Sequence, residues 1–247
     1  DLPATAWKKP EQPSVLMGYD FHLTPDGPRL IEINNNAGGL YLADGRWLPQ
    51  PELPEWRETL QQRLQGMFPA HWRRLAIMDE AVEKQFMYPE MLAYAKLLGR
   101  DSRQVFVVSP EDIGEEKGGL YVGTIRLDAI YNRHTDFYLE SAQLAHIRRA
   151  YMTGDVELSP NPRSYALLGD KRRMVDWWRQ GLLEQFLSAD EVAFIRSIVP
   201  ETRRLADMDA EEVWAERKQW VFKPAARHGG KGVLLGRAMS RKRFDAI

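Results

Sequence analysis

Apolar runs in the middle of the chain predict strands that alternate with a helix. Leu75–Met78 and Val105–Val108 are apolar throughout, as is typical of strands buried on both faces of a parallel sheet. Between them, residues 88–98 carry apolar side chains at helical spacing and stop before a glycine. This pattern predicts a β-α-β unit. Beyond it we expect a small hairpin over 120–127, a strand over 129–131 and a helix over 137–151.

The first third of the chain predicts another hairpin. Two segments with strand character, 15–21 and 30–34, flank Thr24-Pro25-Asp26-Gly27-Pro28, which is strong turn chemistry. Residues 41–54 are rich in Pro, Gly and Asp and predict a loop, and residues 55–64 predict a surface helix.

The last third predicts helices followed by a second hairpin. Helices are expected over 170–178 and 209–217, and one after Ser188, which stands three residues before Glu191 as in a capping box. Trp220–Phe222 and Val233–Leu235 predict two strands joined by a Gly-rich loop.

Composition narrows the function classes. The 247 residues carry a formal charge of −1 with no long run of one sign, so electrostatics does not suggest a nucleic-acid or membrane partner. No apolar stretch is long enough to span a bilayer, and no signal-peptide pattern is present. Cysteine is absent, which excludes disulfides and thiol catalysis and fits a cytoplasmic protein.

The first hairpin carries candidate metal ligands. Glu32 and Asn34 share one strand face, and Asp20 is expected roughly opposite Glu32. Carboxylates placed opposite each other repel unless a cation neutralises them, and oxygen ligands suit Mg²⁺. The alternative is the solvated polar face of an ordinary hairpin.

The second hairpin carries a candidate phosphate loop. Lys223 ends a strand, and the loop that follows includes His228, Gly229, Gly230, Lys231 and Gly232. Glycine lets backbone N–H groups approach phosphate oxygens, and lysine adds positive charge. The spacing fits neither a Walker loop nor a Rossmann fingerprint. The alternative is a flexible basic turn.

Two further basic residues follow strand or helix boundaries. Lys171 stands at a helix start, where it could reach an anion; a solvated helix end is the alternative. Arg133 directly follows a predicted strand, where α/β folds bind ligands, and could hold a substrate carboxylate. A structural Arg133–Asp136 salt bridge is the alternative.

Together these segments resemble the ATP-grasp superfamily. Asp20-Phe21 and Leu30-Ile31-Glu32-Ile33-Asn34 look like its magnesium-binding hairpin. Asp170-Lys171 and Lys223 look like its two phosphate-contacting lysines, Val199-Pro200-Glu201-Thr202 like its Pro-x-Thr strand entry, and Gly229–Val233 like its flexible loop. The metal hairpin comes first here rather than last, an order similar to that of eukaryotic glutathione synthetases.

This resemblance implies a circularly permuted α/β protein, with α+β ATP-grasp lobes and a Rossmann-like pre-ATP-grasp domain. The implied segments are 1–72 (metal-binding lobe segment), 73–158 (Rossmann-like substrate domain) and 159–247 (lobe with the phosphate loop). It further implies Mg²⁺ on Asp20, Glu32 and Asn34, and ATP phosphates on Lys171, Lys223, His228, Gly229, Gly230, Lys231 and Gly232, with Arg133 toward the carboxylate substrate.

The implied activity is ADP-forming ligation of a carboxylate to an amine, each an amino acid or peptide, through an acylphosphate. A kinase-like phosphotransferase and a non-catalytic ATP-binding protein are the alternatives, and homo-oligomer formation stays open. The chain departs from the family in three places: Gly18 replaces an arginine, Arg227-His228 replaces a metal-binding glutamate, and no adenine-contacting linker follows Val233. We expect that linker beyond Ile247.

Overall fold

The computed structural model describes residues 2–47, 54–116, 118–225 and 232–247. The chain divides into two compact units. Unit 1 comprises Asp1–Gly18 and Ile33–Gly169, and unit 2 comprises Tyr19–Glu32 and Asp170–Ile247. Both units are therefore built from two separate stretches of sequence, and the segment predicted as 1–72 contributes to both.

Unit 1 contains a parallel sheet whose strand order is β4-β3-β8-β9. Its strands are β3 (Arg74–Met78), β4 (Gln104–Val108), β8 (Ala129–Asn132) and β9 (Glu157–Ser159). Helix α3 (Tyr88–Leu98) links β3 to β4, so the predicted β-α-β unit is confirmed and the fold is α/β. Strand β9 was not predicted, because three residues are too few to show a strand period.

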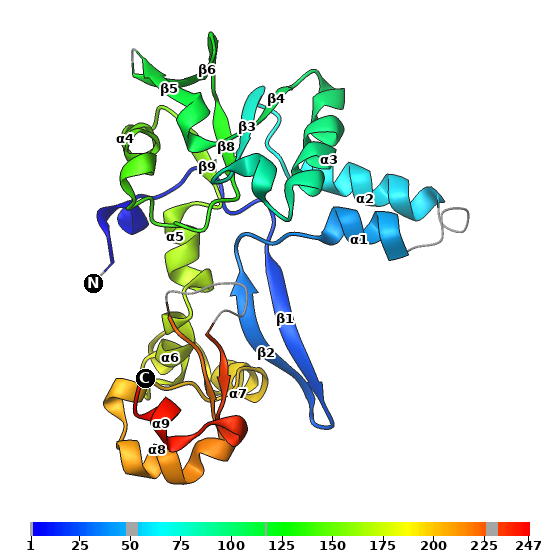
Figure 1. The fold of residues 1–247 in the computed structure, drawn as a ribbon. Helices are drawn as coiled ribbons and strands as arrows, with labels where there is room; N and C mark the ends of the chain where they lie inside the picture. The colour runs from blue at the N-terminus through cyan, green and yellow to red at the C-terminus, as the bar shows by residue number, and fades with distance from the viewer. Residues whose placement is uncertain (1, 48–53, 117, 226–231) are drawn as a thin grey trace. The chain divides into compact units, whose positions relative to one another are not determined.

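Alternate residues of the strands supply the cores on the two faces of this sheet. Leu75, Ile77 and Tyr131 belong to the cluster that includes α3 and α2 (Pro54–Gly66). Ala76 and Ile130 belong to the cluster that includes α4 (Ala145–Thr153). Figure 1 shows α3 and α4 on opposite sides of the sheet. Burial on both faces explains why these strands are continuously apolar.

A small antiparallel sheet and short helices complete unit 1. The small sheet confirms the hairpin predicted over 120–127 and adds β5, which was not predicted. These elements are β5 (Ile113–Glu116), β6 (Gly119–Val122), β7 (Ile125–Arg126), α1 (Leu40–Trp47) and α5 (Pro162–Ser164).

Helix α1 lies where a loop was predicted over 41–54, so that prediction is wrong for its first part. The Glu90 carboxylate, from α3, accepts hydrogen bonds from Gly39 N (2.8 Å) and Tyr41 N (3.0 Å). It satisfies N–H groups at the start of α1 that have no partner within the helix. Glu90 itself is buried. Because the cap comes from a distant residue, local sequence gives no sign of it.

We expect Glu90→Gln to lower the free energy of unfolding by about 2 kcal/mol, because the amide can accept only one of the two bonds with its oxygen. Urea denaturation followed by far-UV circular dichroism measures this change. Glu83→Gln, on the exposed surface of unit 1, is the matched control and should leave the midpoint within error. Equal midpoints for both variants would contradict the capping role.

The helix predicted over 137–151 is shorter than expected, since α4 begins only at Ala145. Upstream of it, the Asp136 carboxylate accepts hydrogen bonds from Glu140 N (3.1 Å) and Ser141 N (2.7 Å). Leu139 has φ 60°, outside the right-handed helical region. The side chain of Asp136 thus competes with helix formation in this segment.

Unit 2 contains helices, a short sheet and most of the first hairpin. The predicted hairpins are confirmed as β1 with β2 and as antiparallel β10 with β11. The bounds are β1 (Gly18–Thr24), β2 (Gly27–Asn34), α6 (Arg172–Trp178), α7 (Ala189–Ile198), α8 (Ala210–Glu216), β10 (Val221–Phe222), β11 (Leu234–Leu235) and α9 (Arg241–Phe244). The capping box predicted at Ser188 and Glu191 is formed.

Two short segments do not form the strands that the sequence predicted for them. Residues 200–204 form no strand in the structure, although Val199–Thr202 was read as a strand entry. Val15 and Leu16 precede β1 and are buried in the unit 1 core instead of extending the hairpin.

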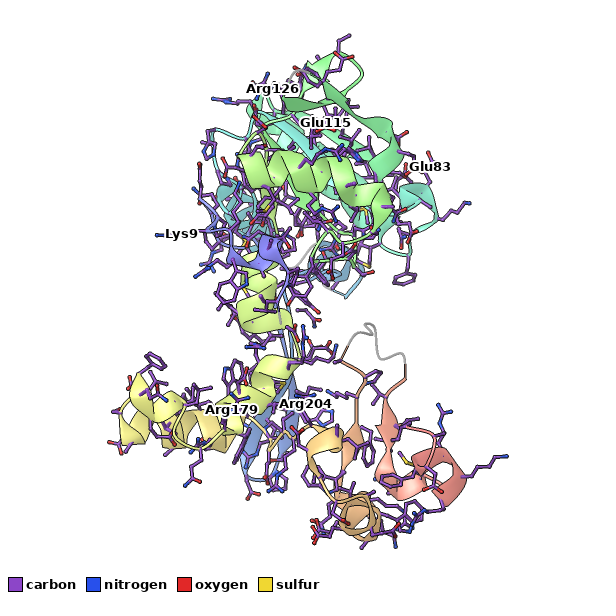
Figure 2. The ribbon with its side chains drawn as sticks, turned by 90° about the vertical axis from the view of Figure 1, so that its left-hand side faces the viewer. Lys9, Glu83, Glu115, Arg126, Arg179 and Arg204 are labelled. Carbon is purple, nitrogen blue, oxygen red and sulfur yellow. The ribbon has the colours of Figure 1, made fainter. Side chains whose placement is uncertain are left out.

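Charged side chains of both signs cover the two units. Figure 2 labels six such residues, all exposed: Lys9, Glu83, Glu115, Arg126, Arg179 and Arg204. Among the residues that the structure describes, none belongs to a helix with both the length and the apolar character needed to cross a bilayer.

Candidate functional site

Two of the predicted site residues form an ion pair in unit 2. Lys171 Nζ lies 3.0 Å from Glu32 Oε1, and the two side chains are only 17% and 22% exposed. This degree of shelter distinguishes the pair from a solvated helix end, which was the alternative for Lys171. A predicted metal ligand and a predicted phosphate-binding lysine therefore neutralise each other in this structure.

Asp170 fixes the backbone next to Lys171. Its buried carboxylate accepts hydrogen bonds from Arg172 N (3.0 Å) and Arg172 Nε (2.9 Å). Because a carboxylate that accepts a backbone N–H two residues on stabilises a turn, this contact holds the entry to α6. Lys171 is thereby presented from an ordered segment.

Lys223 approaches the same hairpin from the other end of unit 2. It directly follows β10, whose Val221 and Phe222 pair with Leu235 and Leu234 of β11. Lys223 Nζ donates a hydrogen bond to the Ile31 carbonyl (3.0 Å), one residue from Glu32 along β2. The second lysine thus lies beside the same stretch of hairpin.

The pKa of Lys223 is changed by burial and by the charged residues around it. Burial lowers this pKa from its ordinary value, although part of the residue keeps exposed surface. The charges of Glu32 and Asp20 raise it, and the charge of Lys171 lowers it. Glu32, Asp20 and Lys171 therefore all act on the charge of Lys223 within a single unit.

The pairing of β1 with β2 determines where the two other metal-ligand candidates, Asp20 and Asn34, lie. A Cβ atom added to Gly18 would lie 3.7 Å from Cβ of Asn34, so these two positions are neighbours on one face of the β1–β2 pair. Side chains two residues apart on a strand share a face. Asp20 and Glu32 then follow on that face, which agrees with the arrangement expected from the sequence.

The predicted phosphate loop falls mostly outside the residues that the structure describes. His228, Gly229, Gly230 and Lys231 lie outside the described residues. Gly232, at the end of the loop, has φ 82°, in the left-handed region that favours glycine. The role of these five residues stays a prediction.

Arg133 lies in unit 1, at the end of β8, and is buried. Its Nη1 donates hydrogen bonds to the Ala37 carbonyl (2.6 Å) and the Tyr131 hydroxyl (3.2 Å). A Cβ atom on Gly38 would come within 2.5 Å of Arg133 Nη2, so a larger residue there would force the guanidinium to shift. Arg133 therefore holds the loop after β2, and its role toward a substrate carboxylate stays a prediction.

The alternative prediction for Arg133, a structural salt bridge with Asp136, is wrong. Asp136 uses its carboxylate for backbone N–H groups, and an Arg133–Asp136 ion pair is absent from the residues described. Sequence reasoning missed Glu90, which caps the segment that Arg133 also contacts. Its position inside an amphipathic helix gave no signal.

The chemistry of the donor set suits a hard divalent cation. Asp20, Glu32 and Asn34 offer two carboxylates and an amide oxygen, which are ligands that Mg²⁺ accepts. Three His, Cys, Asp or Glu side chains do not gather into a metal-binding group anywhere in the described ranges. Where Mg²⁺ binds together with a nucleotide, phosphate oxygens usually supply further ligands.

Unit 2 thus brings two carboxylates and two lysines together, Asp20, Glu32, Lys171 and Lys223, while the roles of these residues and of Asn34 toward a metal or a phosphate stay predictions. This conclusion stands on the geometry alone, because neither the comparison with protein-family models nor that with curated protein sequences gives a match to this chain.

Proposed function

We propose that this protein is an ATP- and Mg²⁺-dependent carboxylate–amine ligase of the ATP-grasp type, similar to glutathione synthetases. The observation that carries the proposal is the convergence of Lys171 and Lys223 on Glu32 and its neighbour Ile31. The Lys223–Ile31 hydrogen bond alone joins positions 192 residues apart. A merely solvated hairpin would not gather two lysines from separate elements.

Each group has a defined part in the proposed reaction. Lys171 and Lys223 bind phosphate oxygens of ATP, and Asp20, Glu32 and Asn34 bind the metal. The metal supplies neutralisation of the charge that develops on the phosphoryl group. The carboxylate substrate takes the γ-phosphoryl group, which releases ADP and forms an acylphosphate. The amine then attacks the acyl carbon, and phosphate leaves as the amide bond forms.

Stoichiometry tests this proposal. The protein is incubated with Mg-ATP and a panel of amino acids and short peptides, singly and in pairs, while ADP release and new products are measured by coupled assay and mass spectrometry. We expect sustained ADP release only with an acid and an amine together, and a product whose mass equals the two substrates minus water.

Hydroxylamine provides the matched control, since it intercepts acylphosphates as hydroxamates. Addition of hydroxylamine in place of the amine should give the hydroxamate of the acid. A stable phosphorylated acid that accumulates with no amine requirement would instead establish the phosphotransferase. ATP binding without ADP release under any of these conditions would contradict ligase activity.

A further inference from the structure

The parallel sheet of unit 1 reverses its strand order between β3 and β8. From β3 the chain moves to β4 on one side and later to β8 on the other. Arg133 N donates to the Met78 carbonyl (2.7 Å), so the carboxyl ends of β3 and β8 lie next to each other. In open α/β sheets, the edge at such a reversal is where small ligands bind.

The polar groups around this edge are mostly engaged within the protein. Asn132 Oδ1 accepts a hydrogen bond from His134 N (3.0 Å), and His134 Nδ1 accepts one from Asp136 N (2.9 Å). The Asn36 amide donates to the Arg133 carbonyl (2.6 Å). His134 Nε2 in turn lies 2.9 Å from Gln143 Nε2. These contacts order the edge, although the buried Asn36 Oδ1 and Asn132 Nδ2 have no hydrogen-bond partner among the described residues.

Asp79, directly after β3, differs from these neighbours. Its Oδ1 accepts one hydrogen bond, from Glu80 N (2.8 Å), and among the residues that the structure describes its carboxylate forms no ion pair. It is partly exposed. An ionised carboxylate has about four acceptor positions. Asp79 is therefore a charged group at this edge that has spare acceptor capacity and no ion-pair partner among the described residues.

The pKa of Asp79 supports this view. Burial raises it to about 6, even though His134 and Arg133 lower it, while Glu80 raises it further. The charged form is thus poorly stabilised by the protein alone. A ligand that brings a cationic N–H donor would stabilise it.

We propose that Asp79 binds the ammonium group of a small amine at the carboxyl edge of β3 and β8. That this amine is the co-substrate of the ligase rests on the proposed function, whereas the binding itself does not. A carboxylate directly after an apolar strand was visible in the sequence, but only the strand order shows that it stands at the reversal.

The test measures binding without nucleotide, using ¹³C-histidine-labelled protein. The His134 ring signal, assigned from a His134→Gln spectrum, reports on the neighbourhood of Asp79. The probe is 1,4-diaminobutane, and tetramethylammonium at equal ionic strength is the control, because it carries charge but no N–H donor. We expect saturable shifts with the diamine only. Equal shifts with both cations, or none with the diamine, would overturn the proposal.

Variants localise the contact. Asp79→Asn should weaken diamine binding at least tenfold, because a neutral amide cannot form the charge-assisted hydrogen bond. Glu80→Gln, which removes the exposed neighbouring carboxylate, should retain binding near the wild-type affinity. The reverse pattern, with loss in Glu80→Gln alone, would refute the role of Asp79.

The wild-type protein provides a second measurement in case the variants fold poorly. Since the carboxyl of Asp79 has a pKa of about 6, nearly all of it is ionised at pH 7.5 and about a tenth at pH 5. The diamine keeps its charge over this range. Diamine affinity should therefore fall roughly tenfold from pH 7.5 to pH 5. Unchanged affinity would exclude Asp79 as the binding group. Because these tests use no nucleotide, a failure here does not contradict the proposed ligase activity, and a failure of the ligase assay does not contradict amine binding by Asp79.

Discussion

Glu32→Gln is expected to lower metal-dependent ATP turnover at least about 100-fold while the fold is retained. The amide keeps the size of the side chain but removes one of the two carboxylates available to Mg²⁺. Asp20 and Asn34 alone would then have to hold the metal next to the triphosphate. Loss of charge complementarity during phosphoryl transfer should appear chiefly in kcat.

The measurement is steady-state ADP release over a range of Mg²⁺ concentrations, with circular dichroism as the check on folding. Glu216→Gln, an exposed carboxylate in the same unit, is the matched control and should behave as the wild type. If Glu32→Gln retained more than about half of the wild-type rate, the assignment of Glu32 as a metal ligand would be wrong.

Lys171→Met should change the affinities for metal and nucleotide in opposite directions. Lys171 neutralises Glu32 at 3.0 Å, so a free divalent cation has to displace an ammonium group to bind Glu32. Removing that ammonium should raise Mn²⁺ affinity about tenfold in the absence of nucleotide. It should also weaken ATP binding by about tenfold or more, because a phosphate-binding charge is lost.

Electron paramagnetic resonance of free Mn²⁺ and fluorescence titration with a labelled ATP analogue measure the two affinities separately. Lys218→Met removes an exposed lysine of unit 2 and should affect neither. Loss of both affinities in Lys171→Met would indicate a purely structural role for the ion pair. Unchanged affinities would remove Lys171 from the site altogether.

The sequence predicted those strands and helices whose apolar runs or capping residues lie within the element itself. The apolar runs at 75–78 and 105–108 identified buried strands, and Ser188 with Glu191 identified a helix start. The helix at Leu40 was missed because its cap, Glu90, comes from another helix. The helix before Ala145 was overextended because Asp136 satisfies backbone N–H groups that would otherwise join it. In both cases a side-chain carboxylate accepts hydrogen bonds from backbone N–H groups, and the local helix pattern gives no sign of this.

The sequence predicted which residues form the candidate site, but not which of them contact each other. Turn chemistry placed Asp20 and Glu32 on one hairpin, and a strand end and a helix start indicated Lys223 and Lys171 before the resemblance added to them. Their ion pair and hydrogen bond depend on tertiary contacts that no local pattern encodes. The same limit applies to Arg133, whose guanidinium reaches backward to the Ala37 carbonyl rather than outward.

The contact between Lys223 and Ile31 also bears on how the chain is made. A ribosome adds about 5–20 residues per second. The 192 positions between these residues then correspond to roughly 10–40 s during which the hairpin has been synthesised but its second lysine has not. Leu30 is buried in the finished protein, and the remainder of its unit begins only at Asp170. The hairpin is thus a segment that a chaperone can bind before unit 2 is complete.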